Sequence, residues 1–241
     1  MAGPLAVLDT FTEVGGGFVP IKNHTPELGG PWSCDETETS PVQSGVSGNK
    51  FAYRPATPIN TPFYSAAGMD GVADGYIEAN FYSFTEVIPI LFGRQTGKGI
   101  SMLDVEIFPD VSTPGAWHFV SDWDYAYITG VTHTSGIKVR LEIVGSSASV
   151  YFGGVLKATI GTDQPGGEWG ISHAVSSLPA DTKQTLDNVN AATNSLPVYN
   201  VLDDLLLTQP ALTSMLRKPR LRFFDGNGKP LVKGFLYLCP A

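Results

Sequence analysis

Residues 117–127 carry the side chains that proteins use to recognise sugars. Aromatic rings stack on the C–H faces of sugars, while nearby carboxylates and amides bind the hydroxyls. Along an extended chain the aromatic residues share one face, and they are Trp117, Phe119, Trp123, Tyr125 and Tyr127. If all these rings point inward they belong to the core, which is the default interpretation. If a bend at Ser121–Asp122 reverses the faces, the candidate glycan-binding residues are Trp123, Tyr125, Asp122 and Asp124.

Catalytic motifs of the common kinds are missing from the sequence. H-E-x-x-H, G-x-S-x-G and phosphate-binding glycine motifs do not occur around the histidines, which are His24, His118, His133 and His173. Cys34 and Cys239 lie far apart and neither belongs to a C-x-x-C pair, so we expect two reduced thiols. The motifs therefore assign no catalytic residue.

Charge and hydropathy restrict the partners. The chain has 15 Lys+Arg against 23 Asp+Glu, a formal net charge of −8, and no basic stripe, so nucleic acid and anionic membranes are not expected partners. No window approaches the ~18 apolar residues that span a bilayer, so membrane insertion is not expected. The first residues lack the basic and apolar regions of a signal peptide, so we expect synthesis in a cytoplasm.

Alternating apolar and polar residues predict an all-β protein. Residues 75–84, 101–108 and 137–160 alternate with the period of a strand, and the last range contains two glycine turns, which indicates a three-stranded antiparallel meander. One-sided burial of such strands favours an antiparallel β-sandwich. Residues 179–194 are rich in Asn and Thr, and we interpret them as a long polar loop, with residues 198–207 as the closing strand.

The C-terminal part differs in character. Residues 221–238 form two apolar runs around Asp225-Gly226-Asn227-Gly228, a strong β-hairpin signal. A hairpin of this size is marginal alone, so it should dock on the sandwich or on another chain. We therefore predict a sandwich domain over residues 5–208, and a linker and β-hairpin over residues 209–241 that is an inter-subunit contact.

Two segments resemble known families. Residues 8–12 and 23–32 resemble the "D-x-F … H-T-P-(D/E)-x-G-G-x-W" opening of concanavalin-A-like jelly rolls, which occur in phage structural proteins and bacterial surface proteins. Residues 166–171 and 201–205 fit later strands of that fold, of which the last pairs with the first strand. Residues 222–237 resemble the "F-x-D-x-N-G-x-P-L" hairpin of tailed-phage tail fibres, although Lys233 replaces a glycine of the pattern.

The glucanase branch of this fold carries its carboxylates on one strand, as E-x-D-x-E. The corresponding segment here is Met102-Leu103-Asp104-Val105-Glu106, in which Met102 takes the place of the nucleophile. A thioether cannot do that work, so we interpret Asp104 and Glu106 as a solvated strand face. The resemblance also implies that a structural calcium ion is possible near the chain ends, with Asp9, Asp203 and Asp204 as donors. No other cofactor is expected.

The resemblances imply a non-enzymatic phage virion protein, namely a fibre, spike or capsid-decoration module whose sandwich binds glycans or the particle surface. Its expected partners are other virion proteins, further copies of itself, with a trimer favoured, and a host-surface glycan, and its expected location is the virion. The alternative is a polysaccharide-degrading glycoside hydrolase with an atypical active site, which would need a further carboxylate near Asp104 or Glu106.

Overall fold

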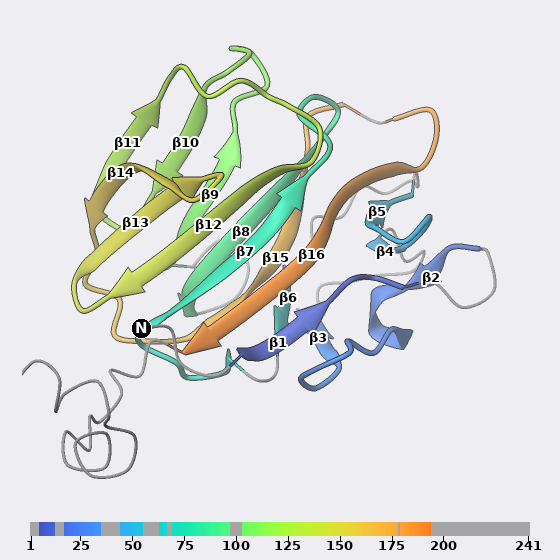
Figure 1. Ribbon diagram of the computed structural model, residues 1–241, viewed down its shortest axis with the longest axis horizontal. Helices are drawn as coiled ribbons and strands as arrows, with labels where there is room; N and C mark the ends of the chain where they lie inside the picture. The colour runs from blue at the N-terminus through green and yellow to red at the C-terminus, as the bar shows by residue number, and fades with distance from the viewer. Residues whose placement is uncertain are drawn as a thin grey trace, which may run out of the picture. The chain divides into compact units, whose positions relative to one another are not determined.

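The computed structural model describes residues 5–12, 17–34, 44–54, 63–66, 69–96, 103–177 and 179–193. In these residues the strands form two antiparallel sheets, one of nine strands and one of seven, which pack as a sandwich (Figure 1). The predicted antiparallel β-sandwich is confirmed. The 3₁₀ helix η1 (Ile21–Asn23) is a single turn, and no helix of the described residues has the length and apolarity needed to cross a membrane.

The nine-stranded sheet runs in the spatial order β14-β13-β12-β7-β16-β5-β4-β2, and β1 also pairs with β16. Its strands are β1 (Leu5–Asp9), β2 (Val19–Pro20), β4 (Ser44–Val46), β5 (Phe51–Tyr53), β7 (Gly75–Phe81), β12 (Ile137–Val144), β13 (Ser147–Phe152), β14 (Val155–Gly161) and β16 (Lys183–Thr193). The seven-stranded sheet runs in the order β11-β10-β9-β8-β15-β6-β3. Its strands are β3 (Trp32–Cys34), β6 (Phe63–Ala66), β8 (Val87–Thr96), β9 (Leu103–Pro109), β10 (Trp117–Val120), β11 (Tyr125–Ile128) and β15 (Glu168–Val175).

The predicted meander is present as β12, β13 and β14. β13 pairs with β12 on one side and with β14 on the other. The turn residues Gly145, Gly153 and Gly154 have φ values of 57°, 56° and 82°, in the left-handed region that glycine enters without a steric penalty. Glycine at these positions therefore fixes both tight turns of the meander.

The prediction of a polar loop over residues 179–194 is wrong, because most of this segment is β16. This strand lies inside the nine-stranded sheet and pairs with β1, β5 and β7. Asn188 has a φ of 50°, and the register with β7 shifts between Asp187 and Asn190. This β-bulge breaks the two-residue period, so that the buried apolar positions no longer alternate; they are Leu186, Val189, Ala191 and Ala192.

β1 pairs with β16, from Leu5↔Ala192 to Asp9↔Val189. The expected pairing of residues 201–205 with the first strand stays a prediction. Residues 194–241 lie outside the described residues. The closing strand at 198–207, the boundary at 208/209 and the C-terminal hairpin therefore stay predictions.

The core lies between the sheets and contains the inward side of every long strand. Large rings fill it, and the indole N–H groups of two tryptophans still find acceptors. Trp117 Nε1 donates to the Val131 carbonyl at 3.0 Å, and Trp169 Nε1 donates to the Val72 carbonyl at 2.8 Å. Trp32 and Trp169 are buried, as expected from their positions after glycine-rich turns.

The opening motif gathers around the buried carboxylate of Asp9. The Phe11 amide donates to Oδ1 at 2.7 Å, His24 Nε2 lies 2.8 Å from the same oxygen, and Trp32 Nε1 donates to Oδ2 at 2.6 Å. The Phe11 ring stacks between His24 and Trp32, with centroid distances of 5.7 and 6.3 Å. Phe11 has a φ of 52°, a strained value for a non-glycine residue, which these contacts hold in place. His24 therefore belongs to the loop that closes this end of the sandwich.

We expect Asp9→Asn to lower the free energy of unfolding by about 2–4 kcal/mol. The asparagine side chain has an NH₂ group in place of one carboxylate oxygen, so two hydrogen-bond donors would face each other there. Urea denaturation followed by tryptophan fluorescence measures this loss. Asp181→Asn is the matched control, because the Asp181 side chain is 75% exposed and should change stability by less than about 0.5 kcal/mol. Equal losses in the two variants would contradict the structural role of Asp9.

Candidate functional site

The turn between β10 and β11 reverses the aromatic face. Ser121 and Asp124 close it, since the Ser121 amide donates to the Asp124 carbonyl at 2.9 Å and the Asp124 amide donates to Ser121 Oγ at 3.0 Å. Phe119 pairs with Ala126 and Trp117 with Ile128, so the inward positions change from odd to even numbers across the turn.

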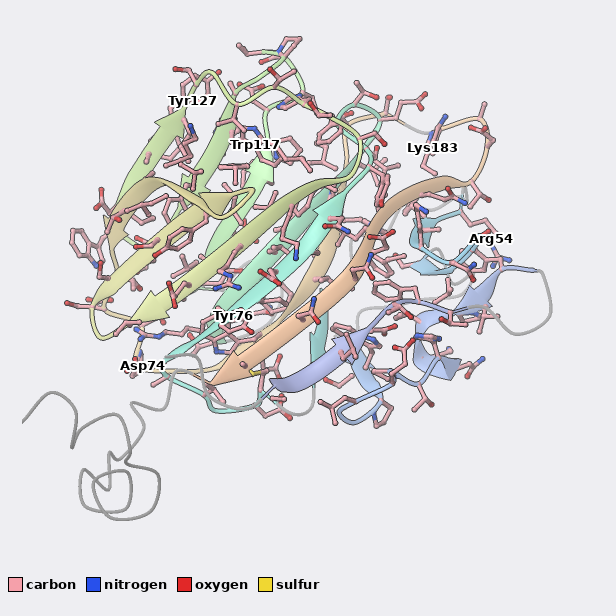
Figure 2. The ribbon with its side chains drawn as sticks, viewed as in Figure 1. Arg54, Asp74, Tyr76, Trp117, Tyr127 and Lys183 are labelled. Atoms are coloured by element: carbon pink, nitrogen blue, oxygen red, sulfur yellow. The ribbon has the colours of Figure 1, made fainter. Side chains whose placement is uncertain are left out.

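The aromatic residues consequently divide into two groups. Trp117 and Phe119 are fully buried, whereas Trp123 is 62%, Tyr125 51% and Tyr127 43% exposed. Figure 2 labels one residue of each group, the buried Trp117 on β10 and the exposed Tyr127 on β11. The default interpretation, in which all five rings belong to the core, is therefore wrong for the second group. The structure has the arrangement that the alternative required.

The two aspartates of the predicted glycan site have different environments. Asp124 accepts the Gly161 and Tyr125 amides, each at 2.8 Å, and these bonds hold the pKa of its carboxyl below the usual value. Asp124 therefore fastens the turn to β14. Asp122 accepts the Thr162 hydroxyl at 3.2 Å, and its hydrogen bond to Asp163 raises the pKa of the Asp163 carboxyl.

Trp123 packs on Gly161 so closely that a Cβ at that position would overlap its ring. All four predicted site residues thus lie around one turn, and Trp123 and Asp122 have groups directed to solvent. Their binding of a glycan stays a prediction.

A second group of polar side chains lies on the outer face of the neighbouring strands. Val105, Ile107 and Phe119 point into the core, so alternation places the remaining residues of β9, β10 and β11 outside. We call this surface the β9–β11 outer face, and it consists of Asp104, Glu106, Phe108, His118, Val120, Tyr125 and Tyr127.

Asp104 and Glu106 are not a solvated strand face, contrary to the expectation. Both are half-buried and hydrogen-bonded to each other, and Asp104 Oδ2 is buried without a hydrogen-bond partner among the described residues. The strand neighbours of Glu106 are Phe92 on β8 and Val120 on β10, which exclude water from both sides.

This environment changes the protonation of the pair. Burial raises the pKa of Asp104 to about 6. Burial, the nearby charge of Asp104 and the hydrogen bond that the Glu106 carboxyl donates to Asp104 together raise the pKa of Glu106 well above its usual value. The pair therefore holds its protons to higher pH than exposed carboxyls do.

His118 stands at the centre of the other cluster on this face. Its Nδ1 lies 3.0 Å from the Tyr125 hydroxyl and its Nε2 lies 3.4 Å from Asp110 Oδ2. The Phe108 ring stacks on the imidazole with a centroid distance of 5.0 Å. Sequence reasoning missed this cluster, because only the register of β9, β10 and β11 brings these residues together.

Asp110 follows directly after β9 and is held by several donors. The Tyr127 hydroxyl donates to Oδ2 at 2.7 Å, and the Ser112 amide and hydroxyl donate to Oδ1 at 2.8 and 2.7 Å. These bonds, with a smaller contribution from His118, keep the pKa of Asp110 well below its usual range. The face thus holds one carboxyl of raised pKa, on Glu106, and one of lowered pKa, on Asp110.

The predicted calcium site is only partly within the described residues. Asp9 already accepts hydrogen bonds through both of its oxygens, and those N–H donors occupy the positions that a cation would take. Asp203 and Asp204 lie outside the described residues. In the described part of the chain, no group of three or more His, Cys, Asp or Glu side chains could hold a metal ion.

No protein-family model matches the chain, and no curated protein matches it in sequence. Solved structures do match its fold. A Bacillus subtilis protein of unknown function with a galectin-like fold has a TM-score of 0.56 at 8% identity, over 80% of this chain and 97% of that one. SCLam, a non-specific endo-β-1,3(4)-glucanase of family GH16, has a TM-score of 0.53 at 10% identity, over 80% and 93%. The Crh5 transglycosylase has a TM-score of 0.50 at 8% identity, over 81% and 89%.

These similarities show the jelly-roll fold of galectins, concanavalin-A-like lectins and glucanases. They also correct the functional expectation. Two of the three structures are carbohydrate-active enzymes, so the comparisons favour the glycoside hydrolase alternative over a non-enzymatic phage virion protein. The phage assignment and the tail-fibre hairpin receive no support from them. The trimer, the virion partners and the virion location were not tested and stay predictions.

The raised pKa of Glu106 gives a testable dependence of stability on pH. The folded state keeps a proton that the unfolded chain releases above about pH 4.3, so the free energy of unfolding should fall as the pH rises toward the folded pKa. Glu106→Gln removes this group, so we expect the variant to gain stability relative to wild type between pH 4.5 and 8. The gain is about 1.4 kcal/mol for each pH unit between the pKa of the unfolded state and the pKa of the folded state. If the folded pKa lies above pH 8, the gain measured stops at the value reached at pH 8.

Urea denaturation at several pH values measures the difference. Glu86→Gln is the matched control, because Glu86 forms only a half-exposed ion pair with Lys183. A difference between wild type and Glu106→Gln that stays constant over the whole range would show that Glu106 is an ordinary exposed carboxyl.

Proposed function

We propose that the chain is a glycoside hydrolase that binds a polysaccharide across the β9–β11 outer face and cleaves it with Glu106 as the general acid. The observation that carries the proposal is Glu106, half-buried and hydrogen-bonded to Asp104, on the same outer face as exposed aromatic rings. A glycosidase acid must hold its proton at working pH and must release it to the departing oxygen. Burial between Phe92 and Val120, together with the charge of Asp104, gives Glu106 this property.

The aromatic residues supply the surface for the sugar rings. Tyr125 and Tyr127 lie on the same face as Glu106, and Trp123 extends that surface at the turn before β11. Flat exposed rings of this kind suit the C–H faces of a polysaccharide. SCLam, which has the same fold, is a non-specific endo-β-1,3(4)-glucanase, and this supports a polysaccharide as the substrate class.

Glu106 needs a second group to complete the reaction. Asp104 is hydrogen-bonded to Glu106, so these two carboxyl groups are closer than the ~5–5.5 Å of a retaining enzyme. Asp110 lies four residues beyond Glu106, the spacing of the two outer glutamates in E-x-D-x-E, but both of its oxygens accept hydrogen bonds from Tyr127 or Ser112. A group on a neighbouring strand is therefore the candidate for this role.

We expect the full chain to release reducing ends from at least one member of a panel of neutral, sulfated and uronate polysaccharides that includes β-1,3 and β-1,4 glucans. Glu106→Gln should lower kcat by at least about 100-fold, because the departing oxygen loses its proton donor. Glu86→Gln should keep the wild-type rate. The proposal fails if wild type cleaves nothing in the panel, or if Glu106→Gln is folded and fully active.

We also expect Trp123→Ala to raise KM by at least about fivefold and to leave kcat unchanged, because a stacking residue binds substrate and transition state alike. Initial rates on the polysaccharide cleaved in the panel give both constants. Leu28→Ala, a truncation of an exposed apolar side chain outside this face, should leave KM as it is. An unchanged KM in Trp123→Ala would remove Trp123 from the binding surface.

A further inference from the structure

Three side chains of the site form a connected line, namely Asp110, His118 and Tyr125. Asp110 Oδ2 lies 3.4 Å from His118 Nε2, and His118 Nδ1 lies 3.0 Å from the Tyr125 hydroxyl. A carboxylate, an imidazole and a hydroxyl in this order form the arrangement that activates a hydroxyl nucleophile. Distances in such arrangements are often longer before substrate binds, so 3.4 Å fits the role.

The carboxylate end of the line is fixed. Three hydrogen bonds from Tyr127 and Ser112 orient Asp110 and keep it ionised. Its negative charge beside Nε2 favours the tautomer that carries the proton there, which leaves the Nδ1 lone pair to accept the proton of Tyr125.

The line is not needed to close the β10–β11 hairpin. Ser121 and Asp124 already close the turn and fasten it to Gly161 on β14. Tyr125 is 51% exposed, and a purely structural hydrogen bond would gain more from a buried position. The Tyr125 hydroxyl is accessible to a ligand on this face.

The position of Tyr125 relative to Glu106 suits a pair that works on one bond. β9, β10 and β11 lie side by side (Figure 1), and Val120 pairs with Glu106 on one side and with Tyr125 on the other. Two strand spacings place the Cα atoms of Glu106 and Tyr125 about 10 Å apart. Its hydroxyl lies at His118 on β10, two residues from Val120, so the Tyr125 side chain extends over the middle strand that separates β11 from β9.

We propose that Tyr125 is the nucleophile of the glycoside hydrolase, with His118 as its base and Asp110 as the residue that positions His118. This inference rests on the proposed function, and it supplies the group that Met102 cannot. A sugar bound over β10 has Tyr125 on one side of its anomeric carbon and Glu106 on the other.

The reaction balances in two steps. First, a bond forms between Tyr125 Oη and the anomeric carbon as the glycosidic C–O bond breaks; the Tyr125 proton passes to His118 Nδ1, and Glu106 gives its proton to the departing oxygen. Second, water attacks the anomeric carbon and gives a proton to Glu106, while the released Tyr125 takes its own proton back from His118. One glycosidic bond and one water are consumed, and two displacements retain the anomeric configuration.

The test uses the full chain and a polysaccharide that it cleaves in the panel. We expect ¹H NMR of the first products to show the retained anomer. Tyr125→Phe should lower kcat by at least about 100-fold with an unchanged circular dichroism spectrum, and so should His118→Gln. Tyr151→Phe, a hydroxyl removal at a half-buried tyrosine on β13 of the other sheet, should keep the wild-type rate. Asp110→Asn should lower kcat while KM stays unchanged, as expected of a positioning residue.

Rescue of activity by azide distinguishes a nucleophile from a residue with a purely structural role. Tyr125→Ala with sodium azide should regain turnover and form a glycosyl azide of inverted configuration, because azide occupies the space of the missing nucleophile. An inverted product from wild type overturns the inference, and so does a Tyr125→Phe rate within about threefold of wild type. In either case the loss of activity in Glu106→Gln leaves the proposed function standing. If wild type cleaves no polysaccharide, both proposals fall.

Discussion

The alternation of side chains along β9 and β10 is the constraint from which the site follows. Val105, Ile107, Trp117 and Phe119 must point inward to fill the space between the sheets, and this burial is the main favourable contribution to folding. The same alternation sends Asp104, Glu106 and His118 to the opposite face. A shift of one residue in either strand would bury charges and expose rings. The packing of the core therefore also fixes which residues lie on the polar outer face.

The turn from Ser121 to Asp124 adds the second constraint. The residues that point inward are odd-numbered before the turn and even-numbered after it. Asp124 holds the turn against β14 by accepting the Gly161 amide. The aromatic rings of β11 are therefore held outside by hydrogen bonds of the turn, although their own hydrophobicity favours burial. Placing Asp104 and Glu106 together between apolar neighbours works against stability at neutral pH in the same way, because the folded state must hold a proton. Both features lower stability and both are located on one face, which is the pattern expected where a site requires them.

The sequence allowed the sandwich and the meander to be predicted, because period-two alternation and turn glycines are local signals. It did not allow β16 to be predicted. The bulge at Asn188 interrupts the two-residue alternation in this segment, and without that alternation a strand cannot be distinguished from a polar loop. The exposure of Trp123 and Tyr125 was left open, since the parity change depends on turn geometry. Asp104 and Glu106 were assigned to solvent because their apolar neighbours, Phe92 and Val120, come from other strands. The line from Asp110 to Tyr125 spans three strands and requires the full register.

The missing nucleophile on β9 led the sequence interpretation toward a protein without catalysis, and the reason is general. A motif on one strand records only groups that are close in sequence, whereas a site on a sheet also draws on the strands at either side. Met102 takes the place of one carboxylate in the E-x-D-x-E pattern, but the hydroxyl and imidazole on β11 and β10 lie across the face that carries Glu106. The fold itself hosts both lectins and hydrolases, so it does not decide between binding and cleavage. The raised pKa of Glu106 does favour cleavage, because binding a sugar hydroxyl needs no raised pKa, whereas protonating a departing oxygen does.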